Sequence, residues 1–137
     1  MAVFRSSNIL ANYNFPLIAA LNVIMNELPS KEAMQSIIEK EIDGMEPGLK
    51  AYASSILIPL KKKVLKWEYG NDEEFPAWEF ANFGERNVGA AYCLGGHGAS
   101  GDFWGLIFTN DDYFGMDAGW YSSFKEMLMD GWHEQNI

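Results

Sequence analysis

The sequence contains a single cysteine, and this scarcity limits the chemistry open to the chain. Cys93 has no partner for an internal disulfide bond. The opening residues, MAVFRSSNIL, have neither the basic leader nor the sustained apolar run of a signal peptide. The apolar segment FPLIAALNVIM is interrupted by Asn22 and falls short of the roughly 20 apolar residues that cross a bilayer. We therefore expect a cytoplasmic protein with no membrane partner.

Basic residues are scarce in the second half of the chain. Residues 67–137 contain two of them, Arg86 and Lys125, against thirteen acidic residues, whereas residues 1–66 contain eight basic residues against six acidic ones. The formal net charge of −9 therefore comes from the second half. Because nucleic-acid binding draws its affinity from Lys and Arg side chains that neutralise phosphates, direct binding of DNA or RNA is disfavoured. A negative surface can speed encounter with a basic protein, although acidity also serves ordinary solubility.

Ligands for metals and phosphates are also few. One cysteine and two histidines do not suffice for the usual zinc sites, and the acidic residues Asp111, Asp112 and Asp117 lack the ligand order of a calcium loop. Residues 96–101, GHGASG, match the glycine spacing of dinucleotide-binding loops, but the strand-like run FWGLIF follows where that fold requires a helix. A glycine-rich flap of the kinase type would need a lysine on the next strand, and none is present there. We expect no metal, no cofactor and a flexible hairpin loop.

Length and composition predict one α+β domain over residues 1–137. Apolar residues make up 48% of the chain and aromatic residues 15%, which suffices for a single core. Helical spacing of apolar residues dominates 1–63, and alternation with period two begins at residue 64. We expect N-terminal helices packed on a mainly antiparallel sheet of four to five strands, followed by a short C-terminal helix.

Three helices are expected in the first part, and strands separated by short turns in the second. The helices are predicted over 17–28, over 30–44 and from Pro47 to about Pro59, so that the lysines at 61–63 would offset the negative end of the third helix dipole. Ser123, with Glu126 three residues later, is typical of a helix start. The strands are predicted at about 64–69, 77–83, 88–94, 103–109 and 112–117.

All five tryptophans fall in the second half, together with most of the acidic residues. They are Trp67, Trp78, Trp104, Trp120 and Trp132. A large apolar ring is costly to leave in water, so most of them are expected in the core, although one or two can serve as exposed anchors at a protein interface. We expect Trp78 and Trp104 in the core, and Trp67 or Trp120 at the rim or surface.

The second half also resembles a known family. The segments WEYG, FPAWEFANF, GAAYCLGGHG, DFWGLIF and YFGMDAGWYSSFKEML are similar in order and texture to the strands and final helix of small bacterial toxin-immunity proteins of the SUKH group. The resemblance covers about half of the chain. It implies a non-enzymatic α+β protein that neutralises a bacterial toxin, often a nuclease, by direct occlusion. Because nuclease sites are basic, an acidic surface would suit such a partner.

Two functional hypotheses therefore stand side by side. In the first, acidic loops flank exposed aromatic rings and bind a basic effector or toxin protein. In the second, the glycine-rich loop 95–101 serves a small-ligand-binding protein or an enzyme, with Cys93 as nucleophile and His97 as its base, although a lone cysteine in a strand usually behaves as a buried apolar residue. Self-association through aromatic residues is a third, plainer hypothesis. The residues expected to bind the partner in the first hypothesis are Trp67, Asp72, Glu73, Glu74, Asp111, Asp112, Tyr113 and Trp120.

Overall fold

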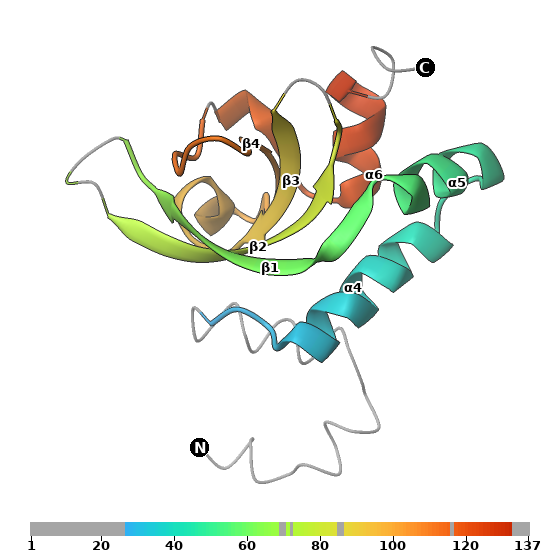
Figure 1. The fold of residues 1–137 in the computed structure, drawn as a ribbon, viewed down its shortest axis with the longest axis horizontal. Helices are drawn as coiled ribbons and strands as arrows, with labels where there is room; N and C mark the ends of the chain where they lie inside the picture. The colour runs from blue at the N-terminus through green and yellow to red at the C-terminus, as the bar shows by residue number, and fades with distance from the viewer. Residues whose placement is uncertain (1–26, 69–70, 72, 85–86, 116, 133–137) are drawn as a thin grey trace, which may run out of the picture.

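The computed structural model describes residues 27–68, 71, 73–84, 87–115 and 117–132. In these residues a five-stranded antiparallel sheet, with strands adjacent in chain order, is combined with helices before and after it (Figure 1). The expected α+β class is confirmed. The helix predicted over 17–28 lies almost wholly outside the described residues. None of the described helices is long and apolar enough to cross a bilayer.

The two helices that precede the sheet begin where their local signals predict. Helix α4, Lys31–Asp43, follows Ser30, whose hydroxyl oxygen accepts a hydrogen bond of 3.1 Å from the backbone N–H of Ala33. Helix α5, Pro47–Ser55, has its proline in the first turn, where a missing N–H costs nothing. The buried side of α4 repeats every four residues, at Met34, Ile38 and Ile42.

Strand β1, Leu57–Lys66, overturns the prediction made for the three lysines. Residues 61–63 lie inside this strand and not at the end of a helix, and Pro59 lies within its irregular stretch, between the paired residues Leu57 and Lys61. The physical reason is position, because β1 is an edge of the sheet. Proline and lysine are the residues that an exposed edge tolerates and that discourage pairing with another chain. Lys62 also covers a core ring, with its Nζ 5.1 Å from the ring of Trp78.

The strands predicted at 77–83, 88–94 and 103–109 are confirmed with small changes of bounds. The first strand, expected from residue 64, begins earlier, at Leu57, because helix α5 ends at Ser55 and not near Pro59. The strand predicted at 112–117 is not found: among the described residues of this segment, sheet pairing is limited to the bridge between Lys66 and Tyr113, and the 3-10 helix η2, Asp117–Gly119, begins at its end. The fifth strand comes later and is short. The strands after β1 are β2, Glu74–Asn82; β3, Val88–Cys93; β4, Trp104–Phe108; and β5, Trp120–Tyr121.

A parallel bridge closes one end of the strongly curved sheet (Figure 1). The backbone N–H of Lys66 donates to the carbonyl of Asp112 at 2.6 Å, and the N–H of Phe114 donates to the carbonyl of Lys66 at 3.2 Å. The segment that follows β4 thereby lies against the end of β1, at the opposite edge of the sheet. Lys63 also links β1 to the end of β4, because its Nζ donates to the carbonyl of Phe108 at 3.0 Å. The end of β1 is thus brought beside residues 108–115.

Two clusters of buried side chains lie on the two faces of the sheet. On the helical face, the ring of Phe80 contacts Trp104 and Phe124, with centroids 5.4 and 5.0 Å apart. Trp78 and Trp104 are buried there, as predicted. Helix α6, Phe124–Met127, is joined to α4 by a hydrogen bond of 2.8 Å from the N–H of Phe124 to Glu41. The second cluster consists of Leu65, Ala77, Ala91, Cys93, Ile107, Phe114 and Trp120.

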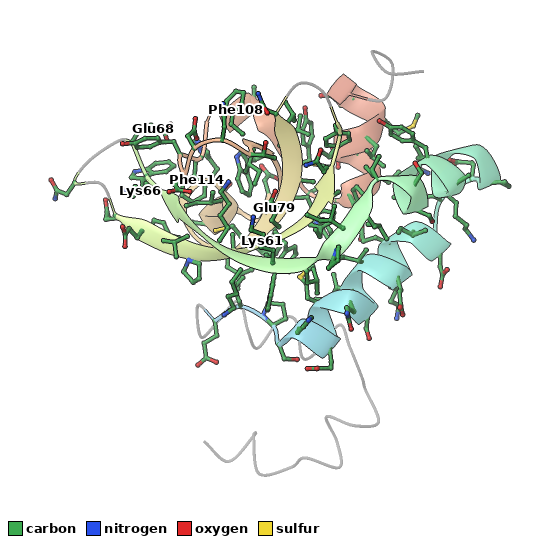
Figure 2. The ribbon with its side chains drawn as sticks, in the orientation of Figure 1. Lys61, Lys66, Glu68, Glu79, Phe108 and Phe114 are labelled. Carbon is green, nitrogen blue, oxygen red and sulfur yellow. The ribbon has the colours of Figure 1, made fainter. Side chains whose placement is uncertain are left out.

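Glu79 is the buried charged side chain of the described residues, at 4% exposure. It lies on β2 directly across from Lys61 of β1, and both are found near the middle of the curved sheet (Figure 2). Its Oε2 lies close to Gly89 of β3, where a Cβ atom would approach it to 3.2 Å. The sheet face that carries the second cluster is therefore apolar near the closed end and polar further along.

Candidate functional site

A hollow of about 480 Å³ opens beside the bridge that closes the sheet, and we call it the acidic hollow. Two of its residues are large rings left exposed, Phe108 at 48% and Tyr113 at 43%. Two others, Glu68 and Asp111, are exposed carboxylates. Aromatic rings rimmed by carboxylates are typical of a surface that recognises a basic partner. The lining residues are Glu68, Phe108, Asp111, Tyr113 and Gly115.

The acidic hollow is assembled by the backbone of three segments. Glu68 follows the end of β1, and Phe108 is the last residue of β4. The third segment follows β4: there the Oδ1 of Asp111 accepts a hydrogen bond of 3.0 Å from the backbone N–H of Tyr113, which fixes the turn that presents the tyrosine. Glu68, Phe108 and the bridging Lys66 all lie toward the same end of the sheet (Figure 2).

A second hollow of about 480 Å³ is lined in part by Trp67, the residue before Glu68, and we call it the aromatic hollow. It is formed where the end of β1 meets the 3-10 helix η1, Gly96–Ser100, and the start of β5. Two tryptophans and a histidine contribute rings, and Asp102 contributes a carboxylate. The lining residues are Trp67, Gly96, His97, Ala99, Ser100, Asp102 and Trp120.

The rings of the aromatic hollow are packed around His97. Its centroid lies 4.7 Å from Trp67, 5.7 Å from Phe114 and 6.2 Å from Trp120. Its Nε2 is 3.2 Å from the carbonyl oxygen of Gly115, and the indole N–H of Trp120 donates to the carbonyl of Phe114 at 3.3 Å. Phe114 is fully buried beneath the three rings. The walls of this hollow are therefore held in place by packing and by backbone hydrogen bonds.

The glycine-rich segment that contributes His97 connects β3 and β4 as the expected hairpin, but it is itself helical. Backbone N–H groups of Gly98 and Gly101 donate to the carbonyls of Gly95 and Gly98, at 2.8 and 2.9 Å. Glycine is required at position 98 because the backbone of Cys93 lies against it, and a Cβ there would collide with the carbonyl oxygen of Cys93. Strand β4 follows η1, so the loop lacks the helix that holds the phosphates in a dinucleotide-binding fold.

Cys93 is separated from the aromatic hollow. Its side chain is fully buried, and its Sγ donates to the carbonyl of Pro76 on β2 at 3.4 Å. Burial raises the pKa of the thiol to about 11, although backbone hydrogen bonds from Gly95 and Leu94 act to lower it. A thiol of this kind is protonated at neutral pH and inaccessible to substrate, so it is unsuited to nucleophilic chemistry.

Comparison with known proteins gives no assignment. The sequence matches no protein-family model, no curated protein and no solved structure. Among the described residues, no group of three or more His, Cys, Asp or Glu side chains is placed to hold a metal ion. The two hollows and their charges are therefore the observations from which function is inferred.

The structure brings several predicted binding residues together at the closed end of the sheet. Tyr113 and Asp111 line the acidic hollow, and Trp67 lines the aromatic one. The backbone N–H of Trp67 donates to the carbonyl of Glu73 at 2.8 Å, which brings the acidic turn before β2 close to both hollows. The side chain of Trp67 is partly buried, as expected of a rim residue.

Other predicted residues contribute differently from the expectation. Trp120 is a predicted partner-binding residue, and either it or Trp67 is predicted at the rim. The structure shows Trp120 as 5% exposed, in a wall of the aromatic hollow. Glu74 and Asp112 are exposed outside the residues that line either hollow, and Asp72 lies outside the described residues. Glu68 and Phe108 were missed, because only the fold places the end of β4 beside the end of β1. No pattern in the sequence predicts that the phenylalanine at the end of this otherwise buried strand is exposed.

Proposed function

We propose that this chain is an acidic protein-binding module that docks a basic protein at the acidic hollow. The observation that carries the proposal is the pair of exposed rings, Phe108 and Tyr113, set beside the carboxylates of Glu68 and Asp111 around one hollow. The rings offer apolar area that a partner can cover, and the carboxylates favour a cationic partner over a neutral one. None of the five lining residues is basic.

The proposal extends to a role in immunity against a bacterial toxin. The resemblance of the second half to SUKH immunity proteins implies occlusion of an effector, often a nuclease, in the cytoplasm. A formal net charge of −9, with thirteen acidic residues after position 66, suits a partner whose active site binds phosphates through Lys and Arg side chains. In this proposal the carboxylates occupy the place of the phosphates and block the toxin.

Affinity capture from the native host tests the proposal. The wild-type chain is expected to retain a basic protein at low ionic strength and to release it at high ionic strength. Tyr113→Ala and the double variant Glu68→Gln, Asp111→Asn should each weaken retention at least tenfold, because they remove an anchor ring and the paired charges. Asp43→Asn, an exposed charge change at the end of α4, is the matched control and should leave retention unchanged.

Two results would overturn the proposal. One is a wild-type chain that captures no basic protein from its host. The other is a captured partner that is retained equally by the wild-type chain and by both acidic-hollow variants. For the immunity role the captured protein must also be toxic when expressed alone, and its toxicity must be suppressed by the wild-type chain.

The second candidate, a small-ligand protein or enzyme using the glycine-rich loop, is favoured in part by the aromatic hollow. His97 lines that hollow, so the loop does contribute to a concave site. The buried Cys93 thiol faces Pro76 instead, which argues against thiol chemistry and in favour of binding. If the chain is such an enzyme, Cys93→Ala must abolish its activity, whereas the buried position predicts an effect on stability alone.

A further inference from the structure

We propose that the aromatic hollow receives the guanidinium group of an arginine side chain from the basic partner. This inference rests on the proposed function and names the group on the partner that the second hollow recognises. It goes beyond the acidic hollow, because the two hollows share no lining residue.

The charge of the aromatic hollow selects a cation. Among the described residues that line it, Asp102 is the one carboxylate, and none is a lysine or an arginine. No ion pair to Asp102 is formed by the basic side chains of the described part of the chain. A partly buried carboxylate with aromatic neighbours attracts an incoming cation more strongly than a fully hydrated one does, because less water screens it.

The rings select a planar cation. Trp67 and Trp120 flank His97 in the hollow, and tryptophan is the aromatic residue that attracts cations most strongly. A guanidinium group can stack on an indole while two of its N–H groups donate to one carboxylate. A lysine ammonium is more strongly hydrated and cannot form that paired contact, so arginine should bind more tightly than lysine.

The walls are already in place before any ligand enters. His97 is fixed by its 3.2 Å contact with the carbonyl of Gly115, and Trp120 by its hydrogen bond to the carbonyl of Phe114. The ring of Phe114 packs against Trp67 from below, with centroids 5.6 Å apart. Since little side-chain order has to be created on binding, a single inserted side chain can gain measurable affinity.

The two hollows are adjacent through the backbone. Trp67 and Glu68 are consecutive residues, and one lines the aromatic hollow while the other lines the acidic hollow. Gly115 lines the acidic hollow and holds His97 of the aromatic one. A partner docked on Phe108 and Tyr113 would therefore have neighbouring side chains within reach of the aromatic hollow.

Small probes test this inference without the partner. N-acetyl-arginine amide is titrated against the full chain while the indole N–H resonances of the tryptophans are followed by NMR. The neutral isostere N-acetyl-citrulline amide, the lysine analogue and methyl glucoside are titrated in parallel. The arginine probe is expected to shift the Trp67 and Trp120 signals and to bind at least tenfold more tightly than citrulline, with lysine between them.

Substitutions assign the site. Asp102→Asn should weaken the arginine probe about tenfold, and Asp43→Asn, the same charge change at the exposed end of α4, should leave its affinity unchanged. Trp67→Leu is the second variant, and it should abolish the shift of Trp120. The indole signals of Trp78 and Trp104, which are buried in the cluster on the helical face of the sheet, verify the fold of each variant before titration.

The inference is overturned if citrulline binds as tightly as arginine, if methyl glucoside shifts the same indole signals in place of arginine, or if Asp102→Asn binds arginine as the wild-type chain does. These results are distinct from failure of the proposed function. Arginine binding with no captured partner would overturn the proposed function alone, whereas a partner captured equally well by Asp102→Asn, with no arginine shift, would overturn this inference alone.

Discussion

At the scale of single residues, two side chains of β3 set an alkaline limit to stability. Burial raises the pKa of the Cys93 thiol from 9.0 to about 11, and burial together with the nearby Glu41 charge raises the pKa of the Tyr92 hydroxyl from 10.0 to about 12. Both groups keep their protons in the folded chain at pH values where they lose them in the unfolded chain. Their contribution to folding is therefore complete below about pH 9 and is lost as the pH rises toward 12.

Each unit of pKa shift corresponds to about 1.4 kcal/mol, so the Cys93 thiol contributes about 3 kcal/mol in all. Roughly 2 kcal/mol of this should be lost from the free energy of unfolding between about pH 9 and pH 11, and the rest on either side of that interval. Cys93→Ala removes this titration and should flatten the fall in that interval, leaving the loss due to Tyr92 at higher pH. Denaturant titrations at several pH values measure it. An equally steep loss in Cys93→Ala would show that another group is responsible.

At the scale of elements, the contact between β4 and β5 depends on a residue without a side chain. A Cβ at Gly105 would collide with the indole ring of Trp120. Gly105→Ala should therefore lower the free energy of unfolding by about 1–3 kcal/mol through overpacking. Gly48→Ala is the matched change, because nothing lies within 4 Å of its Cβ in helix α5, and it should raise stability by about 0.5–1 kcal/mol. Thermal unfolding measures the stability of both variants. If the two substitutions had equal effects on stability, the close contact between Gly105 and the ring of Trp120 would be contradicted.

The exposed edge of the sheet gives a second prediction at this scale. Strand β1 carries Lys61 and Lys62. One side of β1 pairs with β2, and its other side, before Lys66, faces no strand of the described part. Replacing both by threonine keeps β propensity but removes the charges that oppose pairing between two chains. We expect the variant to self-associate at concentrations where the wild-type chain stays monomeric. Sedimentation velocity measures this, with Lys50→Thr on α5 as the control; a variant that stays monomeric would show that another feature protects the edge.

The elements that the sequence predicts correctly carry their own signals. Ser30 marks a helix start through a hydrogen bond made within one turn, and Pro47 marks one because the first turn does not need its missing N–H. The segment 77–83 is marked as a strand by apolar residues bounded by turn residues. The lysines at 61–63 were misplaced, because their role as edge residues depends on strand order across the whole sheet. The segment 112–117 has strand-like composition, but its sheet pairing is limited to the bridge of Tyr113 to Lys66, and that pairing is set by the curvature of the sheet.

At the scale of the whole molecule, closure of the sheet decides which candidate residues meet. Tyr113 and Trp67 are 46 positions apart in the sequence, and the bridge beside Lys66 places them at one end of the fold. Composition could indicate acidic residues and exposed rings, and it did identify Asp111, Tyr113 and Trp67 as candidates. It could not indicate that Asp102 and His97 share a hollow with Trp67, because nothing local relates the loop after β3 to the end of β1.

The net charge of the molecule and the rings of the acidic hollow should act on different steps of partner binding. The field of a chain with net charge −9 acts at long range, so it accelerates the approach of a basic partner and is screened by salt. Contacts of Tyr113 form only in the bound complex, so they slow dissociation. We expect the association rate constant of the captured partner to fall at least tenfold from low to high ionic strength, while Tyr113→Ala raises the dissociation rate constant about tenfold and changes association little. Stopped-flow fluorescence resolves both constants. An association rate that is independent of salt would mean that the acidity of the second half serves solubility rather than recognition.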